Sequence, residues 1–156
     1  MEINKKLIKF IFNKDNTMKE YVVGFMFSPR ATDVVLIKKN RPNWQKGKLN
    51  GVGGLVRENE NVKQAMIREF KEETGIEHEL WDRFAIGTSN DETERVHFYR
   101  TLSHKYDFVV SNEEEEVFII PLDQLDDFPL IYNLKWLIAL ALDHNTLETK
   151  FYYIPN

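Results

Sequence analysis

The chain has 156 residues, a length that suits a single domain over residues 1–156, and its 42% hydrophobic content is enough to fill one core. Cysteine is absent, which excludes disulfide bonds and thiolate chemistry. The formal net charge of −4 argues against general nucleic-acid binding through a basic surface.

The sequence contains no pattern typical of a signal peptide or a membrane span. Its first 14 residues hold only a short, interrupted apolar run. The longest apolar stretch, at residues 134–142, contains Lys135 and is too short to cross a bilayer. We therefore expect a cytoplasmic protein without a membrane partner.

Alternating apolar residues predict strands in the first part of the chain, at residues 6–12, 21–27 and 33–39. Residues 49–56, LNGVGGLV, are rich enough in glycine to form short strands around a tight loop. The segment before this loop is basic and flanks an aromatic residue. Lys39 and Arg41 either meet substrate phosphates or are solvated loop residues, and Trp44 either stacks on a base or covers the core.

The segment 61–74 is predicted to be an amphipathic helix. Its apolar residues recur at spacings of three and four, namely Val62, Ala65, Met66 and Phe70. Asn59 or Asn61 can cap the start of this helix. Gly75 suits the left-handed conformation that ends a helix.

Three carboxylates, Glu69, Glu72 and Glu73, stand at i, i+3 and i+4 away from this apolar stripe. They repel one another, and they lie in the last turns, where the helix dipole favours cations. A divalent cation would reverse both penalties, and carboxylate oxygens suit Mg²⁺ or Mn²⁺. The other interpretation is a solvated helix face.

Further strands are predicted at residues 80–88, 95–102 and 116–122, followed by a helix at 131–143 and a closing strand at 150–155. Strands combined with two helices, one of them after a crossover, indicate a mixed sheet packed between helices. The expected fold class is therefore α/β.

The segment 54–76, GLVRENENVKQAMIREFKEETGI, resembles the Nudix box. The matching positions, at the spacing of that motif, are Gly54, Glu60, Arg68, Glu69, Glu72, Glu73 and Gly75. For seven residue types at usages of roughly 5 to 7% each, a chance match is on the order of one in a hundred million. The resemblance implies an α/β/α sandwich in which the box forms a strand, a loop, a helix and a turn.

The resemblance also implies roles for the polar positions. The ligands of a catalytic Mg²⁺ or Mn²⁺ would be Glu69, Glu72, Glu73 and the main-chain carbonyl of Gly53. The residues that hold the loop and the glutamates in place would be Arg68, Glu60, Gly54 and Gly75. The cations neutralise a pyrophosphate link and polarise a bound water.

The general base comes, in this family, either from the box or from a carboxylate on a later loop. Glu69 is the candidate within the box. The later candidates precede an apolar strand, as in many family members, and are Glu113, Glu114, Glu115 and Glu116. This run is either a source of the base or a hydrophilic loop, and nothing in the sequence ranks the four glutamates.

The lead-in to the box, NGVGG at residues 50–54, is similar to that of Nudix enzymes that hydrolyse oxidised purine nucleoside triphosphates. In those enzymes the asparagine reads the base. Asn50 either does so here through its amide or is a simple turn asparagine. Leu49 stands where tryptophan is often found, and Val52 where proline is common.

The expected function is Mg²⁺-dependent hydrolysis of the pyrophosphate bond in a nucleoside diphosphate derivative. Candidate substrates are nucleoside triphosphates including oxidised purine nucleotides, nucleotide sugars, ADP-ribose, dinucleoside polyphosphates and capped RNA ends. The alternative is a Nudix-like domain that binds a nucleotide as a sensor without turnover, although the intact glutamates favour catalysis. Because family members often dimerise, a homodimer is a further hypothesis.

Overall fold

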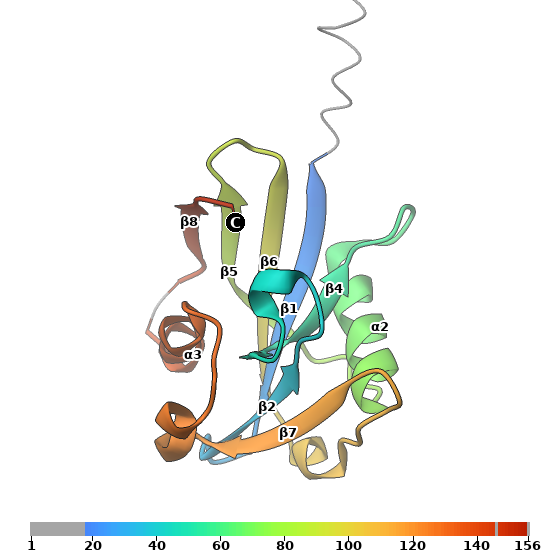
Figure 1. Cartoon of the computed structure of the whole chain (residues 1–156), viewed down its shortest axis with the longest axis vertical. Helices are drawn as coiled ribbons and strands as arrows, with labels where there is room; N and C mark the ends of the chain where they lie inside the picture. Colours follow the sequence, from blue (N-terminus) through green and yellow to red (C-terminus); the bar gives the residue numbers. More distant parts are fainter. Residues whose placement is uncertain (1–17, 146, 156) are drawn as a thin grey trace, which may run out of the picture.

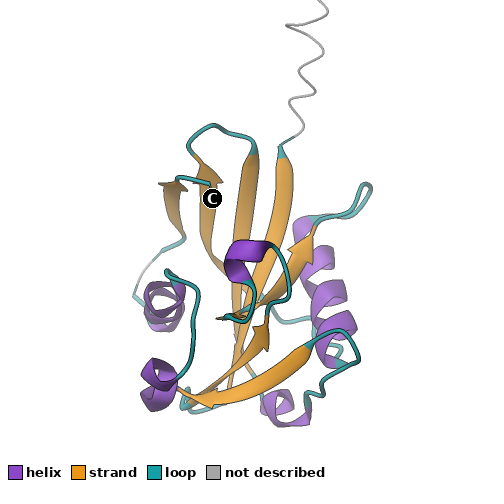
Figure 2. Ribbon diagram, viewed as in Figure 1, coloured by secondary structure: helices purple, strands orange, loops and turns teal. Residues whose placement is uncertain are grey.

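The computed structural model describes residues 18–145 and 147–155. A mixed sheet of eight strands runs through this part of the chain, and helices lie on both of its faces (Figure 1; Figure 2). The predicted α/β fold, with a mixed sheet between helices, is confirmed. The strand predicted at residues 6–12 lies outside the described residues.

The remaining predicted strands are present and differ mainly at their ends. In chain order the strands are β1 (Lys19–Phe27), β2 (Asp33–Lys38), β3 (Leu49–Asn50), β4 (Val52–Leu55), β5 (Asp82–Ser89), β6 (Glu94–Leu102), β7 (Glu116–Pro121) and β8 (Thr149–Tyr153). The glycine-rich segment forms β3 and β4, which are joined by the single residue Gly51.

Strand β1 lies inside the sheet and changes partners along one of its sides. On the other side it pairs in parallel with β6 along its whole length. On the changing side, residues 21–24 pair antiparallel with β4, whereas Phe27 pairs with Val34 of β2. Strand β2 also pairs with β3 and β7. The sheet therefore divides beside β1 into a short branch, β4, and a long branch, β2, β3 and β7.

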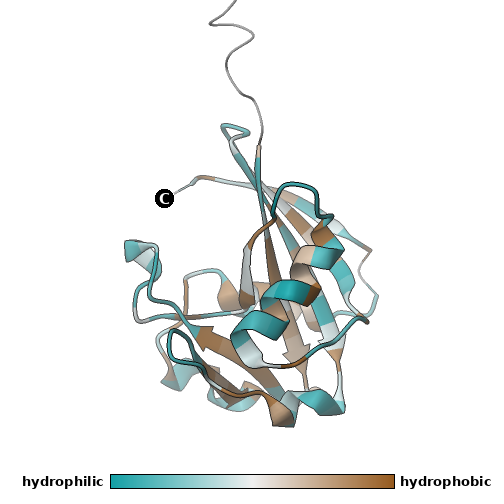
Figure 3. Cartoon of the chain, turned by 90° about the vertical axis from the view of Figure 1, so that its right-hand side faces the viewer, coloured by the Kyte–Doolittle hydropathy of each residue, from teal (hydrophilic) through white to brown (hydrophobic). Residues whose placement is uncertain are grey.

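Helix α2 (Val62–Thr74) packs on one face, against β1 and β4. Asn61 caps its start, because its side chain accepts from the Gln64 N–H and the Gln64 side chain accepts from the Asn61 N–H. Gly75 ends the helix at φ 78°. Its inward side chains join a cluster of Val22, Val52, Ala65, Met66, Phe70 and Trp81. Figure 3 shows the outward side of α2 as mostly hydrophilic.

Helix α3 (Leu134–Leu142) packs on the other core, which includes Phe25, Phe27, Leu36, Phe84, Phe98, Leu134, Leu137 and Ile138. It begins at Leu134 rather than Ile131, because the chain just before it bonds to β3. The Leu49 N–H donates to the Pro129 carbonyl at 2.8 Å, and the Ile131 N–H donates to the Leu49 carbonyl at 3.1 Å. Among the described residues, no helix has the length and apolar character needed to span a membrane.

Three short 3₁₀ helices are absent from the sequence prediction: η1 (Asn43–Gln45), η2 (His104–Phe108) and η3 (Leu122–Asp127). Elements of one or two turns leave no apolar periodicity to detect. Helix η1 connects β2 to β3 and therefore carries Trp44 and Gln45 beside the long branch (Figure 1).

Candidate active site

The guanidinium group of Arg68 connects the loop before α2 with carboxylates on α2. Its Nε and Nη2 donate to the two carboxylate oxygens of Glu60, at 3.0 and 2.6 Å. Its Nη1 donates to Glu69 Oε1 at 2.8 Å and to Glu72 Oε2 at 3.2 Å. Its Nη2 also donates to the Leu55 carbonyl at 3.0 Å. One side chain therefore fixes the loop relative to two glutamates.

This ion-pair group lies mostly out of solvent, since the side chains of Arg68 and Glu69 are 18% and 13% exposed. The hydrogen bond from Arg68 lowers the pKa of Glu60, although burial opposes this effect. The same bond raises the pKa of Arg68. Both partners therefore remain charged, and charge-assisted bonds of this kind are stronger than those between neutral groups.

Strand β4 brings backbone unusually close to the glutamates of α2. The Gly53 N–H donates to Glu73 Oε2 at 3.2 Å. A Cβ added at Gly54 would lie 2.5 Å from both Cδ and Oε1 of Glu69, so the end of the Glu69 side chain would have to move. A Cβ added at Gly53 would lie 1.8 Å from the Val22 carbonyl oxygen of β1. Glycine at these two positions thus permits the approach of β4 to α2 and to β1.

Glu73 is the most perturbed carboxyl group of this region. The pKa of Glu73 is raised to about 8, mainly by burial. The negative charges of Glu69 and Glu115 contribute to this rise, whereas the positive charge of Lys39 and the Gly53 N–H oppose it. Four ionisable side chains, from α2, the end of β2 and the loop before β7, therefore interact at one place.

The four consecutive glutamates at the start of β7 and in the loop before it have different surroundings. Glu113 and Glu114 are exposed, and Glu116 pairs with Lys38 at 3.9 Å. Glu115 is only partly exposed, and its Oε2 is buried with no hydrogen-bond partner among the described residues. Burial raises the pKa of Glu115, with Lys39 and Arg41 opposing and Glu114 and Glu69 adding to the effect. Of the four consecutive glutamates, Glu115 is thus the one that interacts electrostatically with Glu69 and Glu73 of α2.

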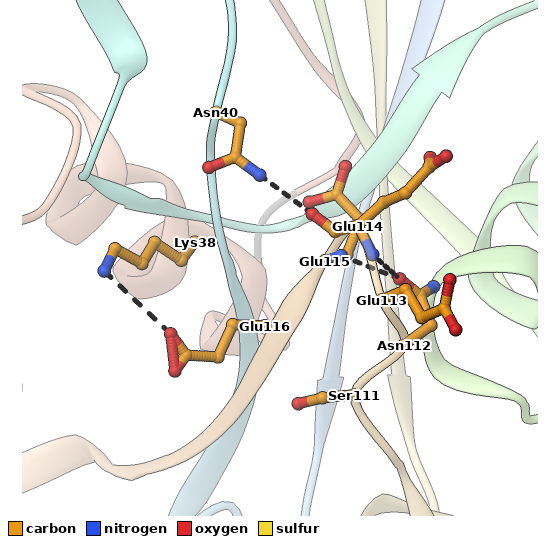
Figure 4. A pocket seen from close by; sticks show the side chains of 8 residues that line it. All are labelled: Lys38, Asn40, Ser111, Asn112, Glu113, Glu114, Glu115 and Glu116. Atoms are coloured by element: carbon orange, nitrogen blue, oxygen red, sulfur yellow. Dashed lines mark hydrogen bonds and ion pairs between the residues drawn. The ribbon is translucent and has the colours of Figure 1, made fainter.

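Asn112, which the sequence interpretation did not single out, holds this loop against α2. Its Oδ1 accepts from the N–H groups of Glu114 and Glu115, at 2.9 and 2.7 Å. Its Nδ2 donates to the Glu72 carbonyl at 3.1 Å. A pocket of about 350 Å³ is lined by residues 111–116 with Lys38 and Asn40, whose Nδ2 donates to the Glu114 carbonyl (Figure 4).

The carboxylates do not form a ready-made metal cluster. Within residues 18–145 and 147–155, no three His, Cys, Asp or Glu side chains meet in metal-binding geometry. Arg68 engages Glu69 and Glu72, and the Gly53 N–H engages Glu73, so each of the three predicted ligands already has a polar partner.

The residues considered for substrate binding fall into two groups. Lys39 and Arg41 interact electrostatically with the carboxylates, since both act on Glu115. Trp44 is 38% exposed, and its ring lies 6.3 Å from that of Tyr132 between centroids. Asn50 is 8% exposed and donates from Nδ2 to Gln45 Oε1 at 3.2 Å. The sequence interpretation missed Tyr132, which meets Trp44 of η1 from the segment before α3, and Gln45, whose contact with Asn50 joins η1 to β3.

Comparison with known proteins was made by family model, by curated sequence and by structure. A family model described as the NUDIX domain matches residues 18–138, well over half of the chain. No match was found among curated proteins.

Solved structures with the same fold include MutT from work on Aliivibrio salmonicida and Vibrio cholerae, with a TM-score of 0.64, 22% identity, and coverage of 79% of this chain and 98% of the other. An ADP-ribose pyrophosphatase from Streptococcus suis has a TM-score of 0.62 and 23% identity, with coverage of 86% of this chain and 99% of the other. The NUDIX domain of Shewanella oneidensis NrtR, complexed with ADP ribose, has a TM-score of 0.65 and 18% identity, with coverage of 89% of this chain and 98% of the other. By the match to the family model, and in agreement with this fold, the chain belongs to the NUDIX family.

Proposed function

We propose that the protein hydrolyses the pyrophosphate bond of a nucleoside diphosphate derivative with the help of Mg²⁺ or Mn²⁺, and releases a nucleoside monophosphate. The observation that carries this proposal is the position of Glu73, which accepts from the Gly53 N–H at 3.2 Å and interacts electrostatically with Glu69, Glu115 and Lys39. The negative charges of Glu69 and Glu115 raise the pKa of Glu73, and partly buried carboxylates grouped in this way are unfavourable unless a cation or proton joins them.

The donor set fits a hard divalent cation, because Mg²⁺ takes carboxylate and carbonyl oxygens and completes its shell with water and substrate phosphates. The residues that would hold it are Glu69, Glu72 and Glu73 with the carbonyl of Gly53. When bound, such a cation neutralises phosphate charge and polarises a water molecule. Arg68 and Glu60 keep the glutamates in position, and Lys39 and Arg41 supply positive charge for the phosphates.

Glu115 is our choice for the general base. Within the described residues its buried Oε2 has no hydrogen-bond donor, and burial raises its pKa, which makes the ionised carboxylate a stronger acceptor for a proton from water. Glu69 is less suited to this role, because its Oε1 already accepts a hydrogen bond from Arg68 at 2.8 Å.

The proteins that share the fold support a choice of substrates to test. One of these structures is described as an ADP-ribose pyrophosphatase, one is a NUDIX domain complexed with ADP ribose, and others are MutT proteins. Nucleoside triphosphates, including oxidised purine nucleotides, and ADP-ribose are therefore the first substrates to test. Nucleotide sugars, dinucleoside polyphosphates and capped RNA complete the set.

The purified protein should be incubated with each substrate and Mg²⁺ or Mn²⁺, and the products separated by chromatography. We expect metal-dependent cleavage of one class, abolished by chelation, with Glu73→Gln reducing turnover by about a hundredfold or more while the fold is retained. Glu79→Gln, which changes an exposed glutamate beyond the box, is the matched control. Nucleotide binding without any turnover would refute hydrolysis and support a sensor.

A further inference from the structure

The segment before β7 covers the end of helix α2. The last carbonyls of a helix have no partners within the helix itself. In this protein the Thr74 carbonyl accepts from the Val110 N–H at 3.0 Å. The Glu72 carbonyl accepts from Asn112 Nδ2 at 3.1 Å, and the same Nδ2 group lies 3.5 Å from the Glu73 carbonyl. The amide of Asn112 therefore meets the main chain of two glutamates that are proposed to hold the cation.

Asn112 also holds the main chain of Glu115 on both sides. Its Oδ1 accepts from the Glu115 N–H at 2.7 Å, and its own N–H donates to the Glu115 carbonyl at 3.0 Å. Figure 4 shows the bonds that join the Asn112 side chain to Glu114 and Glu115. A rotation of the Glu115 backbone would break at least one of its bonds to Asn112.

The contacts of Asn112 require an amide side chain. A backbone N–H can only donate, so the end of the amide that meets Glu114 and Glu115 is the oxygen. The end that meets the Glu72 carbonyl is then the NH₂ donor. A turn needs only the acceptor, and aspartate supplies that as well as asparagine does. The turn by itself therefore does not explain the donor to α2.

These bonds fix the position of a loop rather than the stability of the fold. Asn112 is exposed, and hydrogen bonds that compete with water contribute little to the free energy of folding. They do join the loop that carries Glu115 to the last turn of α2, which carries Glu73. The side chains of Glu115 and Glu73 interact electrostatically, so a shift of the loop changes the arrangement of the site. A displacement of about 1 Å in an active site can cost about a hundredfold in rate.

We propose that Asn112 is a positioning residue for hydrolysis, which holds Glu115 at a fixed place relative to the glutamates of α2. It acts through Glu115, because it joins the main chain of that residue to the end of the helix. The other side of the loop is held by Asn40, whose Nδ2 donates to the Glu114 carbonyl at 2.8 Å. The inference rests on the proposed function and on Glu115 as its general base.

Two substitutions separate the donor to α2 from the turn. Asn112→Asp keeps the acceptor for the loop N–H groups but loses the donor, and Asn112→Ser loses the donor without adding a charge. With the best substrate, both variants should lower kcat by about tenfold while KM stays within about twofold. Asn145→Asp, at an exposed position after α3, is the matched control and should have wild-type kinetics. A fall in kcat for Asn112→Asp alone would assign the effect to the added charge and overturn the proposal.

A double-mutant cycle distinguishes the positioning of Glu115 from general damage to the site. In a Glu115→Gln background, Asn112→Ser should change kcat by less than about twofold, because the carboxylate on which Asn112 acts is already removed. A further tenfold loss in that background would mean that Asn112 acts by another route, and would refute the proposal. Urea unfolding of Asn112→Ser should have nearly the wild-type midpoint. A marked fall of this midpoint that accounts for the lost turnover would mean a purely structural role.

Failure of this inference can be distinguished from failure of the proposed function. Hydrolysis by the wild type that is unchanged in both Asn112 variants would overturn the inference and leave the proposed function intact. Equal turnover by Glu115→Gln and the wild type would also overturn it, because Asn112 would then have no base to position. Absence of hydrolysis by the wild type would overturn the proposed function, and the inference with it.

Discussion

Arg68 shows how much of the site depends on the shape of a single side chain. Its planar guanidinium group donates to Glu60, Glu69 and Glu72 in three directions at once. A lysine ammonium group has the same charge, but it is a compact point that cannot span these partners. Charge alone therefore does not account for arginine at this position.

Arg68→Lys should reduce kcat by about 10- to 100-fold, because the glutamates lose the partner that orients them. Steady-state kinetics with the best substrate of the panel would measure this effect. Arg57→Lys is the matched control, since Arg57 is 62% exposed and meets Glu72 only at 3.4 Å. Equal losses in the two variants would contradict a special role for Arg68.

Substitution of the two adjacent glycines by alanine should affect different properties, turnover in one case and stability in the other. The Cβ of Gly54→Ala would displace the end of the Glu69 side chain, which can move, so turnover should fall about tenfold or more with little loss of stability. The Cβ of Gly53→Ala would meet the Val22 carbonyl of β1, which is backbone, so the free energy of unfolding should fall by about 3 kcal/mol or more. Urea denaturation and kinetics on both variants test this contrast. The same phenotype in both would refute it.

At the scale of elements, a buried polar link joins strands that are distant in sequence. The Arg83 guanidinium group of β5 can only donate, so His97 Nδ1 of β6 must accept from it at 3.1 Å. His97 Nε2 then carries the proton and donates to Glu20 Oε1 of β1 at 3.0 Å. His97 is thus a neutral structural histidine that connects β1, β5 and β6.

This link predicts a particular pH dependence of stability. Burial lowers the pKa of His97, and Arg83 and Arg95 lower it further, whereas Glu20 opposes them. The folded state therefore binds fewer protons than the unfolded chain, so this contribution is present above the ordinary histidine pKa of about 6.5 and is lost as pH falls below it. The free energy of unfolding of His97→Gln should be lower than that of the wild type by about 1 kcal/mol at pH 7.5, and this difference should be smaller at pH 5.

Denaturant unfolding of the wild type and of His97→Gln at both pH values would test this expectation. His144→Gln is the control, because that histidine is exposed. A difference in the free energy of unfolding that stays constant or becomes larger at low pH would show that protonation of His97 is not coupled to folding.

Elements whose determinants are local could be predicted from the sequence. The limits of α2 follow from an apolar stripe, the cap Asn61 and the terminating Gly75, all within one short segment. Which of the four glutamates at residues 113–116 interacts with α2 could not be identified in this way. The answer depends on the register of β7 against β2. Glu116 pairs with Lys38, so the side chain of the preceding Glu115 points to the opposite face. The contacts of Asn112 and Gln45 likewise require the fold.

At the scale of the whole molecule, the site gathers residues from distant parts of the chain. Lys39 follows β2, Gly53 lies on β4, the glutamates of the box lie on α2, and Glu115 precedes β7. Only the box is continuous in sequence. The rest of the site exists because the two branches of the sheet and α2 converge.

Glu115→Gln tests this convergence. We expect kcat to fall by about a hundredfold, within the range for loss of a general base, while KM changes little. Glu113→Gln should have little effect, because Glu113 is exposed. Steady-state kinetics of both variants across pH 6 to 9 would check this. Equal activity in the Glu115 variant and the wild type would contradict a role of Glu115 as general base and favour Glu69.

The residue Gly51 separates the two branches at the site, since Asn50 ends β3 and Val52 begins β4. It is confined, because an added Cβ would lie 2.7 Å from Val23 Cγ1 and 2.8 Å from Phe25 Cε1. An extra residue inserted here has no room to bulge. The number of residues between Asn50 of β3 and Gly53 of β4 is therefore fixed as strictly as their identity. An insertion in this segment is expected to disturb the pairing of both strands, whereas an exchange of the Asn50 side chain leaves the spacing unchanged.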